Sequence, residues 1–349
     1  MFGLNKPKFE LISPPDLSFG SLATCIDDID GPNWLMDWVN IELPVLSVHG
    51  NHDNPHGEFS ASAIDLLVTM GLLSHFGRIR DQNQVAIYPV SLKKGKTLIN
   101  IFGLGSVKDE RLNAMLEDER VRFVNPDNID QAFNILVLHQ NRTKRGPSDK
   151  SYFQEENIPK FIDFVLWGHE HDNRVALGKL GLTFFSNYSK FSLKSLKAQM
   201  KEYSPIADCF ITQPGSTVPT SLSEGESTRK HIGQLIVNQN RFTFIEHELE
   251  TTRVVLWSSI SLTDICTMET DIHGNSRLPK NYVAQTEEGL DAEIERLLRI
   301  AENERKKKYP RAPKLPLVRV RVVHCFEKFK DFNANAYNRK WENKIGIGD

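Results

Sequence analysis

The chain has 349 residues, of which 40% are hydrophobic and 25% charged, an ordinary composition for a globular protein of about two domains. Its 43 basic and 45 acidic residues give a formal net charge of -2, so the overall charge indicates neither a nucleic-acid nor a membrane partner. The four cysteines form no CxxC pair, which excludes a zinc or disulfide framework, and no apolar run approaches the ~18 residues of a membrane span, so we expect no membrane contact.

Short apolar runs in residues 1–253 predict a layered α/β domain. In chain order, we expect strands at 44–48, 97–102, 135–138, 161–167, 232–237 and 241–245, and a charged helix at 111–120. A further helix should hold Ile64 and Val68, begin at Ser60 or Ser62 and end at Gly71. Because several of the strands are almost continuously apolar, they are expected to be buried on both faces.

A second, smaller α+β domain is expected over residues 254–349. Apolar residues recur at helical spacing, which predicts an amphipathic helix, at Leu290, Ile294, Leu297, Leu298 and Ala301. The basic run 305–308 follows at its carboxyl end, where the helix dipole favours cations; a nuclear import signal is the alternative interpretation. Beyond a proline-rich linker, residues 317–322 alternate Val with Arg319 and Arg321, which predicts a strand whose arginine face meets either DNA or solvent.

Three of the predicted strands lead directly into loops that carry histidine. These loops are Gly-Asn-His-Asp at 50–53, His-Gln-Asn-Arg at 139–142 and Gly-His-Glu-His at 168–171. Ligands of open α/β sheets gather at the carboxyl ends of strands, so the loops are expected to meet there. Imidazole, amide and carboxylate groups together suit divalent metals such as Mn, Fe or Zn, and the glycines allow close backbone approach. One such histidine would most often be a surface residue, but the set predicts a shared metal site.

These loops resemble the third, fourth and fifth motifs of the calcineurin-like metallophosphoesterases. Longer stretches resemble the eukaryotic double-strand-break repair nucleases of the meiotic recombination eleven family, namely residues 47–55, 102–106, 109–112, 138–142, 211–226 and 316–321. The similarity extends over nearly the whole chain. It implies a layered metallophosphoesterase β-sandwich flanked by helices over residues 1–253, followed by a DNA-binding capping domain over residues 254–349.

The resemblance also implies a metal centre. Asn51, His139 and His169 would hold one manganese ion, and His171 would hold a second. Two such ions, close together, clamp the attacking and leaving oxygens during phosphodiester hydrolysis.

Three more side chains take roles from the same resemblance. His52 would lie at the scissile phosphate and assist the leaving oxygen. Asp53 would orient His52 through its other ring nitrogen, with a simple turn residue as the alternative. Arg142 is expected to bind the substrate.

The implied function is a manganese-dependent DNA nuclease, acting as a 3′-5′ exonuclease and single-strand endonuclease in the double-strand-break repair complex. Expected partners are DNA, an SMC-like ATPase (Rad-fifty), nibrin and a second copy of the chain in a homodimer. The expected location is the nucleus, with roles in homologous recombination, meiosis and telomere maintenance. A protein phosphatase is the rival enzyme, but those enzymes typically read Gly-Asn-His-Glu where residues 50–53 read Gly-Asn-His-Asp.

The family's first two motifs, an Asp-x-His pair and a Gly-Asp pair, have no counterpart here. Residues 9–13 already resemble the segment that follows them, so we expect a chain that begins inside the domain and is truncated at both ends. Asp27, Asp28 and Asp30 have the right chemistry in the wrong context. The second metal site is therefore expected to be incomplete, and the alternative function is a catalytically inactive truncated isoform or fragment that retains only binding surfaces.

Another departure is a long insertion at 182–203, where the family's connection is shorter. Lysines recur there at helical spacing, at Lys190, Lys194, Lys197 and Lys201. This pattern predicts a basic amphipathic helix that could contact DNA phosphates, a partner or a membrane surface, with a solvated insertion as the alternative.

Overall fold

A computed structural model describes residues 6–19, 31–37, 39–56, 61–79, 83–144, 146, 151–173, 183–185, 203–324, 329 and 332–346. The chain divides into two compact units. Unit 1 comprises residues 1–170, 174–215 and 233–246, and unit 2 comprises residues 171–173, 216–232 and 247–349. The domain division at residue 253, expected from the sequence, stays a prediction. Among the described residues, every helix is too short or too polar to cross a bilayer.

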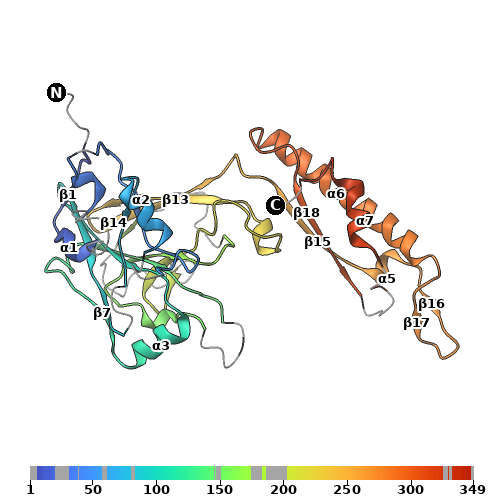
Figure 1. The fold of residues 1–349 in the computed structure, drawn as a ribbon, viewed down its shortest axis with the longest axis horizontal. Helices are drawn as coiled ribbons and strands as arrows, with labels where there is room; N and C mark the ends of the chain where they lie inside the picture. Colours follow the sequence, from blue (N-terminus) through green and yellow to red (C-terminus); the bar gives the residue numbers. More distant parts are fainter. Residues whose placement is uncertain are drawn as a thin grey trace. The chain divides into compact units, whose positions relative to one another are not determined.

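A mixed seven-stranded sheet is the centre of unit 1 (Figure 1). Its strands, in spatial order, are β1 (Glu10–Leu11), β5 (Pro89–Lys94), β6 (Thr97–Leu104), β8 (Phe133–His139), β9 (Phe164–Gly168), β12 (Cys209–Thr212) and β11 (Tyr203–Ser204). The four strands β6, β8, β9 and β12 run parallel, and antiparallel strands close both edges. Parallel neighbours bring their carboxyl ends to one edge, where His139 of β8 is paired with Gly168 of β9.

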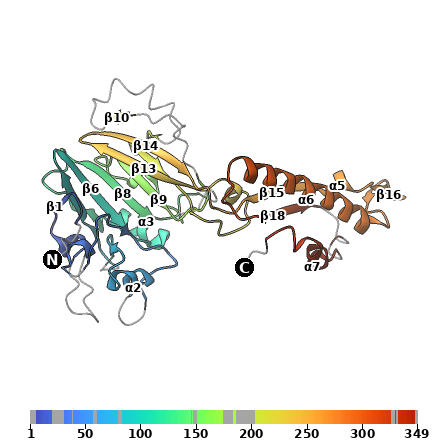
Figure 2. The ribbon, with the colours of Figure 1, turned by 90° about the horizontal axis from the view of Figure 1, so that it is seen from above.

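A second sheet packs on one face of this sheet and makes a sandwich. It contains β10 (Thr183–Phe185), β14 (Arg241–Glu248) and β13 (His231–Asn238). Phe242 of β14 contacts Phe133, Phe164 and Phe210 of the first sheet, at ring-centroid distances of 5.2, 5.8 and 5.0 Å. Figure 2 shows β13 and β14 alongside β8 and β9 of the first sheet, and Figure 1 shows α3 on the opposite side of that sheet from β13 and β14.

The opposite face carries the larger core. Leu136 and Leu138 of β8 are buried there with Trp167 of β9, against Leu112 and Met115 of α3 (Asp109–Glu117). Because β8 buries side chains on both faces, its almost unbroken apolar run is explained, as the sequence predicted. The parallel pair β4 (Val85–Ile87) and β7 (Val121–Phe123) packs on the same core.

Short elements next to the sandwich position the first motif loop. The strands β2 (Leu46–Ser47) and β3 (Ser74–His75) run parallel, and α2 (Ala63–Thr69) lies between them in sequence. Ser62 caps α2 in a capping box with Asp65, and Gly71 closes it at φ +74°, as predicted. The other short elements of this unit are α1 (Pro15–Ser18) and the 3-10 helices η1 (Asn33–Leu35) and η2 (Glu155–Asn157).

Unit 2 is built on one long helix packed against two parallel strands. The strands are β15 (Val255–Ser261) and β18 (Leu317–Val323), and the helix is α6 (Tyr282–Lys307). As predicted, Leu290, Ile294, Leu297 and Ala301 form its buried face. The remaining elements are η3 (Gly225–Ser227), α5 (Leu262–Ile265), β16 (Glu269–Thr270), β17 (Ser276–Arg277), α7 (Ala334–Asn338) and η5 (Arg339–Trp341).

The layered α/β sandwich expected from the sequence is confirmed, while several element boundaries were wrong. The strand expected at 44–48 is only two residues long, and β9 begins at Phe164 rather than 161 because the preceding residues form a turn with Ile162 N–H bonded to Pro159 O. On β18, Arg319 and Arg321 are exposed and the alternating valines Val318, Val320 and Val322 are partly buried, as the alternation predicted. Asp27, Asp28, Asp30 and the four lysines of the 182–203 insertion lie outside the described residues.

Candidate metal centre

Three side chains, one from each histidine-bearing motif, meet in unit 1. The Asn51 Oδ1 atom lies 3.0 Å from His139 Nε2 and 3.3 Å from His169 Nδ1. The rings of His139 and His169 are nearly perpendicular, with centroids 5.3 Å apart. One amide oxygen and two imidazole nitrogens, contributed by loops 118 residues apart in sequence, therefore face a common point.

The spacing of these three atoms fits a divalent metal ion. Two metal bonds of about 2.1 Å at right angles separate their ligand atoms by about 3 Å, close to the separations found here. Imidazole and amide ligands suit manganese, iron or zinc. In the described part of the chain, however, no group of three or more His, Cys, Asp or Glu side chains could hold a metal. Asn51, His139 and His169 thus supply a partial ligand set.

The backbone around His139 and His169 is adapted to this convergence. A Cβ atom on Gly50 would lie 2.8 Å from His139 Cε1, and one on Gly168 would lie 3.2 Å from His139 Nδ1. The two motif glycines therefore leave room for the His139 ring, as predicted. His169 itself has a φ of +88°, a conformation that costs a non-glycine residue about 1–3 kcal/mol and is concentrated at functional sites.

A buried network behind the first loop was not predicted. His49, which precedes Gly50, is 1% exposed, and its Nδ1 lies 3.3 Å from His75 Nε2. The other nitrogen of His75 lies 2.9 Å from Asp65 Oδ1, and Arg78 pairs with the same carboxylate. Ser106 N–H donates to His49 O, and a Cβ on Gly105 would lie 2.1 Å from His49 Cε1. The buried, closely packed His49 therefore fixes the start of the loop at residues 50–53.

Burial dominates the electrostatics of this network. Burial, and then the neighbouring His75, lower the pKa of His49 to about 4, so His49 is neutral at physiological pH. Burial by itself would raise the pKa of Asp65, but hydrogen bonds from His75 and Ser62 N–H, with the charge of Arg78, hold it below its ordinary value.

Glu170 ties the second and third motif loops together. Its Oε1 accepts hydrogen bonds from the backbone N–H groups of Arg142 and Thr143, at 3.0 and 3.2 Å. The Arg142 side chain donates to Glu155 Oε1 at 3.0 Å and to Gln213 Oε1 at 3.2 Å, and its guanidinium lies 5.2 Å from the centre of the Trp167 ring. Arg142 thus has a structural role, and its substrate contact stays a prediction.

His52 and Asp53 occupy the tip of the first loop. His52 is exposed, as a group that meets a substrate must be. Asp53 is half-buried, and its N–H donates to Gly50 O at 3.2 Å, which closes a turn. This is the turn role that the sequence left open beside the role of orienting His52.

His171 belongs to unit 2, where it has its own hydrogen-bonding partners. Its Nδ1 lies 2.5 Å from Thr220 Oγ1 and 3.4 Å from Glu226 Oε1, while half of the side chain is exposed. Glu226 is 2% exposed and forms an ion pair of 3.1 Å with the equally buried Lys230. Burial by itself would raise the pKa of Glu226, but hydrogen bonds from Thr220 and Lys230 lower it to about 2. The sequence pattern gave no sign that Lys230 is buried.

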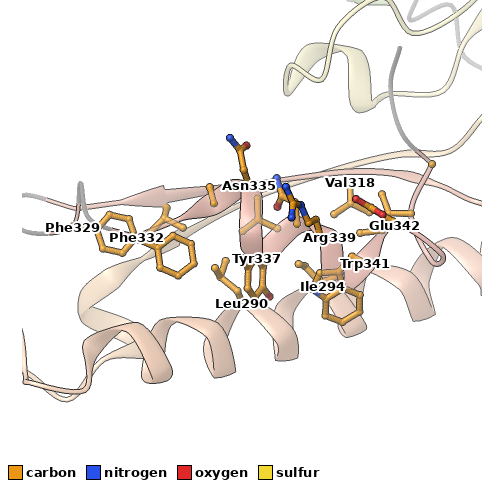
Figure 3. Close-up of a pocket in the computed structure, with 16 residues that line it drawn as sticks. Leu290, Ile294, Val318, Phe329, Phe332, Asn335, Tyr337, Arg339, Trp341 and Glu342 are labelled. Carbon is orange, nitrogen blue, oxygen red and sulfur yellow. The ribbon is translucent and has the colours of Figure 1, made fainter.

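Unit 2 also has an apolar pocket of about 500 Å³ between α6, β18 and the segment around α7 (Figure 3). Leu290, Ile294, Phe332, Tyr337 and Trp341 line it. The Tyr337 hydroxyl donates to Asp291 Oδ1 at 2.8 Å, whereas the buried Trp341 Nε1 has no hydrogen-bond partner among the described residues. The pocket therefore offers surface for packing rather than a set of reactive groups.

Comparisons with known proteins show similarity over most of the chain. Residues 26–173 match the family described as calcineurin-like phosphoesterase, and residues 242–346 match the Mre11 DNA-binding presumed domain. The double-strand break repair protein MRE11 of Macaca fascicularis and that of Homo sapiens are each 34% identical over 97% of the chain, and that of Arabidopsis thaliana is 34% identical over 88%.

The chain spans 42% of the length of the macaque and human relatives and 38% of the plant relative. The phosphoesterase match includes all three motif loops and ends at Asn173, and the DNA-binding match covers the elements β15, α6 and β18. The chain thus matches the calcineurin-like phosphoesterase family in its first half and the Mre11 DNA-binding presumed domain in its second, and it is similar to the MRE11 double-strand break repair proteins.

Proposed function

We propose that the chain is the core of a manganese-dependent DNA nuclease of double-strand break repair. The convergence of Asn51, His139 and His169 at 3.0 and 3.3 Å is the observation that carries the proposal. The match of residues 242–346 to a DNA-binding presumed domain, and the names of the relatives, support DNA as the substrate.

In this proposal Asn51, His139 and His169 hold one Mn²⁺ ion and His171 holds a second. When bound, such ions withdraw charge from the scissile phosphate and lower the pKa of the attacking water. His52, exposed at the loop tip, donates a proton from its imidazole to the leaving oxygen, and Asp53 shapes the turn that presents it. The hydrogen bond from Arg142 N–H to the Glu170 side chain holds the loops of His139 and His169 together.

The resemblance extends the proposal to the whole protein. We expect 3′-5′ exonuclease and single-strand endonuclease activity, a homodimer, and partnership with an SMC-like ATPase (Rad-fifty) and nibrin in the nucleus. Homologous recombination, meiosis and telomere maintenance are the processes in which such a nuclease acts.

A nuclease assay with matched histidine variants tests the proposal. The full chain is incubated with Mn²⁺ and end-labelled single-stranded and double-stranded DNA. His52→Asn should lower the cleavage rate by about 10²–10⁴-fold, the usual worth of a general acid. His56→Asn is the control, since His56 is an exposed histidine four residues further on. Equal rates for the two variants would contradict the role of His52.

A second candidate function is a catalytically inactive chain that retains binding surfaces. The partial ligand set favours this candidate. Among the described residues, no group of three or more His, Cys, Asp or Glu side chains could hold a metal ion. A chain that binds DNA in the same assay but leaves every substrate intact, with all variants alike, would support this candidate and contradict the first.

A further inference from the structure

Unit 2 contains a buried ion pair that has no role in the proposed mechanism. Lys230 and Glu226 are each 2% exposed and lie 3.1 Å apart. Burying two charges is costly unless both are fully hydrogen-bonded, and a loop at the surface has no general need for such a pair.

Every proton of the Lys230 ammonium group has a partner. Its Nζ donates to Glu226 Oε2 at 3.1 Å, to Ser216 Oγ at 3.0 Å and to His171 O at 3.1 Å. An ammonium group has three protons and no acceptor, so these three bonds saturate it. The charge of Lys230 thereby keeps Glu226 ionised, and Lys230 also fixes the backbone of His171.

An ionised Glu226 determines where the Thr220 proton lies. A carboxylate can only accept hydrogen bonds, so the Thr220 hydroxyl must donate to Glu226 Oε1, which lies 2.6 Å away. Thr220 N–H also donates to Glu226 Oε2, at 2.9 Å, which fixes the position of the residue. With its single proton used, the Thr220 oxygen can take part in a further hydrogen bond only as an acceptor.

The third link is the His171 ring. Its Nδ1 lies 2.5 Å from Thr220 Oγ1, and because that oxygen can only accept, Nδ1 must carry the proton. Glu226 Oε1, 3.4 Å from the same nitrogen, favours the same form. Neutral His171 is then protonated at Nδ1, and its Nε2 has a free lone pair on a half-exposed ring.

We propose that Lys230, Glu226 and Thr220 are positioning residues that hold His171 in the Nδ1–H tautomer, so that Nε2 is ready to bind a divalent cation. The inference rests on the proposed function only for the identity of that ligand. Metal-binding histidines commonly donate their second nitrogen to a carboxylate or another oxygen in this way, which fixes the ring and its tautomer.

The tautomer can be measured on the metal-free full chain. Histidine is labelled with ¹⁵N, and long-range ¹H–¹⁵N correlation spectra are recorded at a pH where His171 is neutral, with His171→Gln to assign its signals. We expect Nδ1 of His171 to be protonated and Nε2 to have the shift of an unprotonated nitrogen. A parent chain with Nε2 protonated would overturn the proposal.

Variants of threonine separate positioning from simple folding. Thr220→Val removes the acceptor oxygen and leaves the buried ion pair intact, so the His171 signals should move toward the Nε2–H tautomer that a free histidine side chain prefers. Thr220→Ser keeps the hydroxyl and should restore the parent spectrum. Thr228→Val is the control, because Thr228 is an exposed residue of the same loop whose hydroxyl donates to Gly225 O. An unchanged tautomer in Thr220→Val would also overturn the proposal.

Titration with Mn²⁺ then separates this inference from the proposed function. Selective paramagnetic broadening of the His171 ring signals in the parent, weaker in Thr220→Val, is the expected result. If the Nδ1–H tautomer is found but Mn²⁺ broadens no His171 signal, the claim that His171 is prepared for a cation is overturned. DNA cleavage is scored separately, so loss of nuclease activity with an intact tautomer and intact broadening counts against the proposed function alone.

Discussion

Each of the two units contains a buried carboxylate linked to a motif histidine, and the two networks end differently. In unit 1, Asp65 binds His75, and His75 binds His49, which is 1% exposed. In unit 2, Glu226 binds Thr220, and Thr220 binds His171, whose side chain is half exposed. Two similar chains of hydrogen bonds thus lead to a histidine that no ligand can reach and to one that a ligand can.

The difference between the two networks shows that the role of a motif histidine depends on two properties. These are the hydrogen-bond partner of its ring nitrogen and the exposure of its side chain. The pKa of His49 is lowered to about 4 by burial, its ring packs against Gly105, and its carbonyl accepts from Ser106, all of which stabilise the loop before Asn51. In unit 2 the charged groups of Glu226 and Lys230 are buried, whereas the His171 ring to which they are linked remains half exposed. The following changes test this distinction, in order of decreasing effect.

Removing the buried ammonium group should have the largest effect on stability. Lys230→Met leaves the Glu226 carboxylate buried without its counter-charge, and breaking such a pair costs about 3–5 kcal/mol. Urea denaturation of the full chain, with hydrogen exchange in peptides covering residues 216–232, measures the loss. Lys314→Met, at an exposed lysine of the same unit, should change nothing.

A double variant sharpens this prediction. Adding Glu226→Gln to Lys230→Met removes the stranded charge, so the pair of changes should be less destabilising than Lys230→Met alone. Equal or greater destabilisation in the double variant would show that the effect of Lys230→Met does not come from an unpaired Glu226 charge.

The carboxylate of unit 1 should stabilise the fold in a pH-dependent way. Asp65→Asn weakens the contacts with His75 and Arg78 and should cost about 1–3 kcal/mol at neutral pH. The folded pKa of Asp65 is below its ordinary value of 3.8, so its contribution is present above that pH and is lost as the pH falls through the folded pKa.

The difference in unfolding free energy between the parent and Asp65→Asn should therefore be constant from neutral pH to about pH 5 and then shrink as the solution becomes more acidic. Asp118→Asn, at an exposed aspartate of unit 1, serves as the comparison. A difference that grows on acidification would reverse the sign argued here.

Filling the space beside His49 should also destabilise unit 1. An alanine at position 105 would place its Cβ 2.1 Å from His49 Cε1, and the buried ring has little room to move. Gly105→Ala should cost about 1–3 kcal/mol, a typical penalty for overpacking, and thermal denaturation would measure it. Gly146→Ala, where nothing lies within 4 Å of the added atom, should be nearly neutral.

The smallest stability change is expected at the outer link of unit 2. Thr220→Val removes the hydrogen bond that the hydroxyl donates to the ionised Glu226, which keeps its bonds from Thr220 N–H and Lys230, so the change should cost about 1.5 kcal/mol. A much larger loss, comparable with that of Lys230→Met, would indicate that the network of unit 2 stabilises the fold as that of unit 1 does and has no separate orienting role.

The sequence predicted the sandwich and the convergence of the loops better than it predicted the networks. Apolar runs that end at His139 and Gly168 mark the ends of buried strands, and parallel pairing then places those ends together. The link from Asp65 to His75 joins a helix to a two-residue strand, and no periodicity identifies such a contact. Lys230 was unpredictable for another reason, because lysine is almost never buried unless it is paired.

Binding of Mn²⁺ to the purified full chain, measured by titration with detection of free Mn²⁺ by electron paramagnetic resonance, tests the central claim most directly. The chain should bind at least one equivalent; His169→Ala should abolish this binding because it removes one of three converging ligands, whereas the exposed His273→Ala should bind like the parent. Absence of binding in the parent, or equal binding by His169→Ala and His273→Ala, would contradict a metal centre at Asn51, His139 and His169.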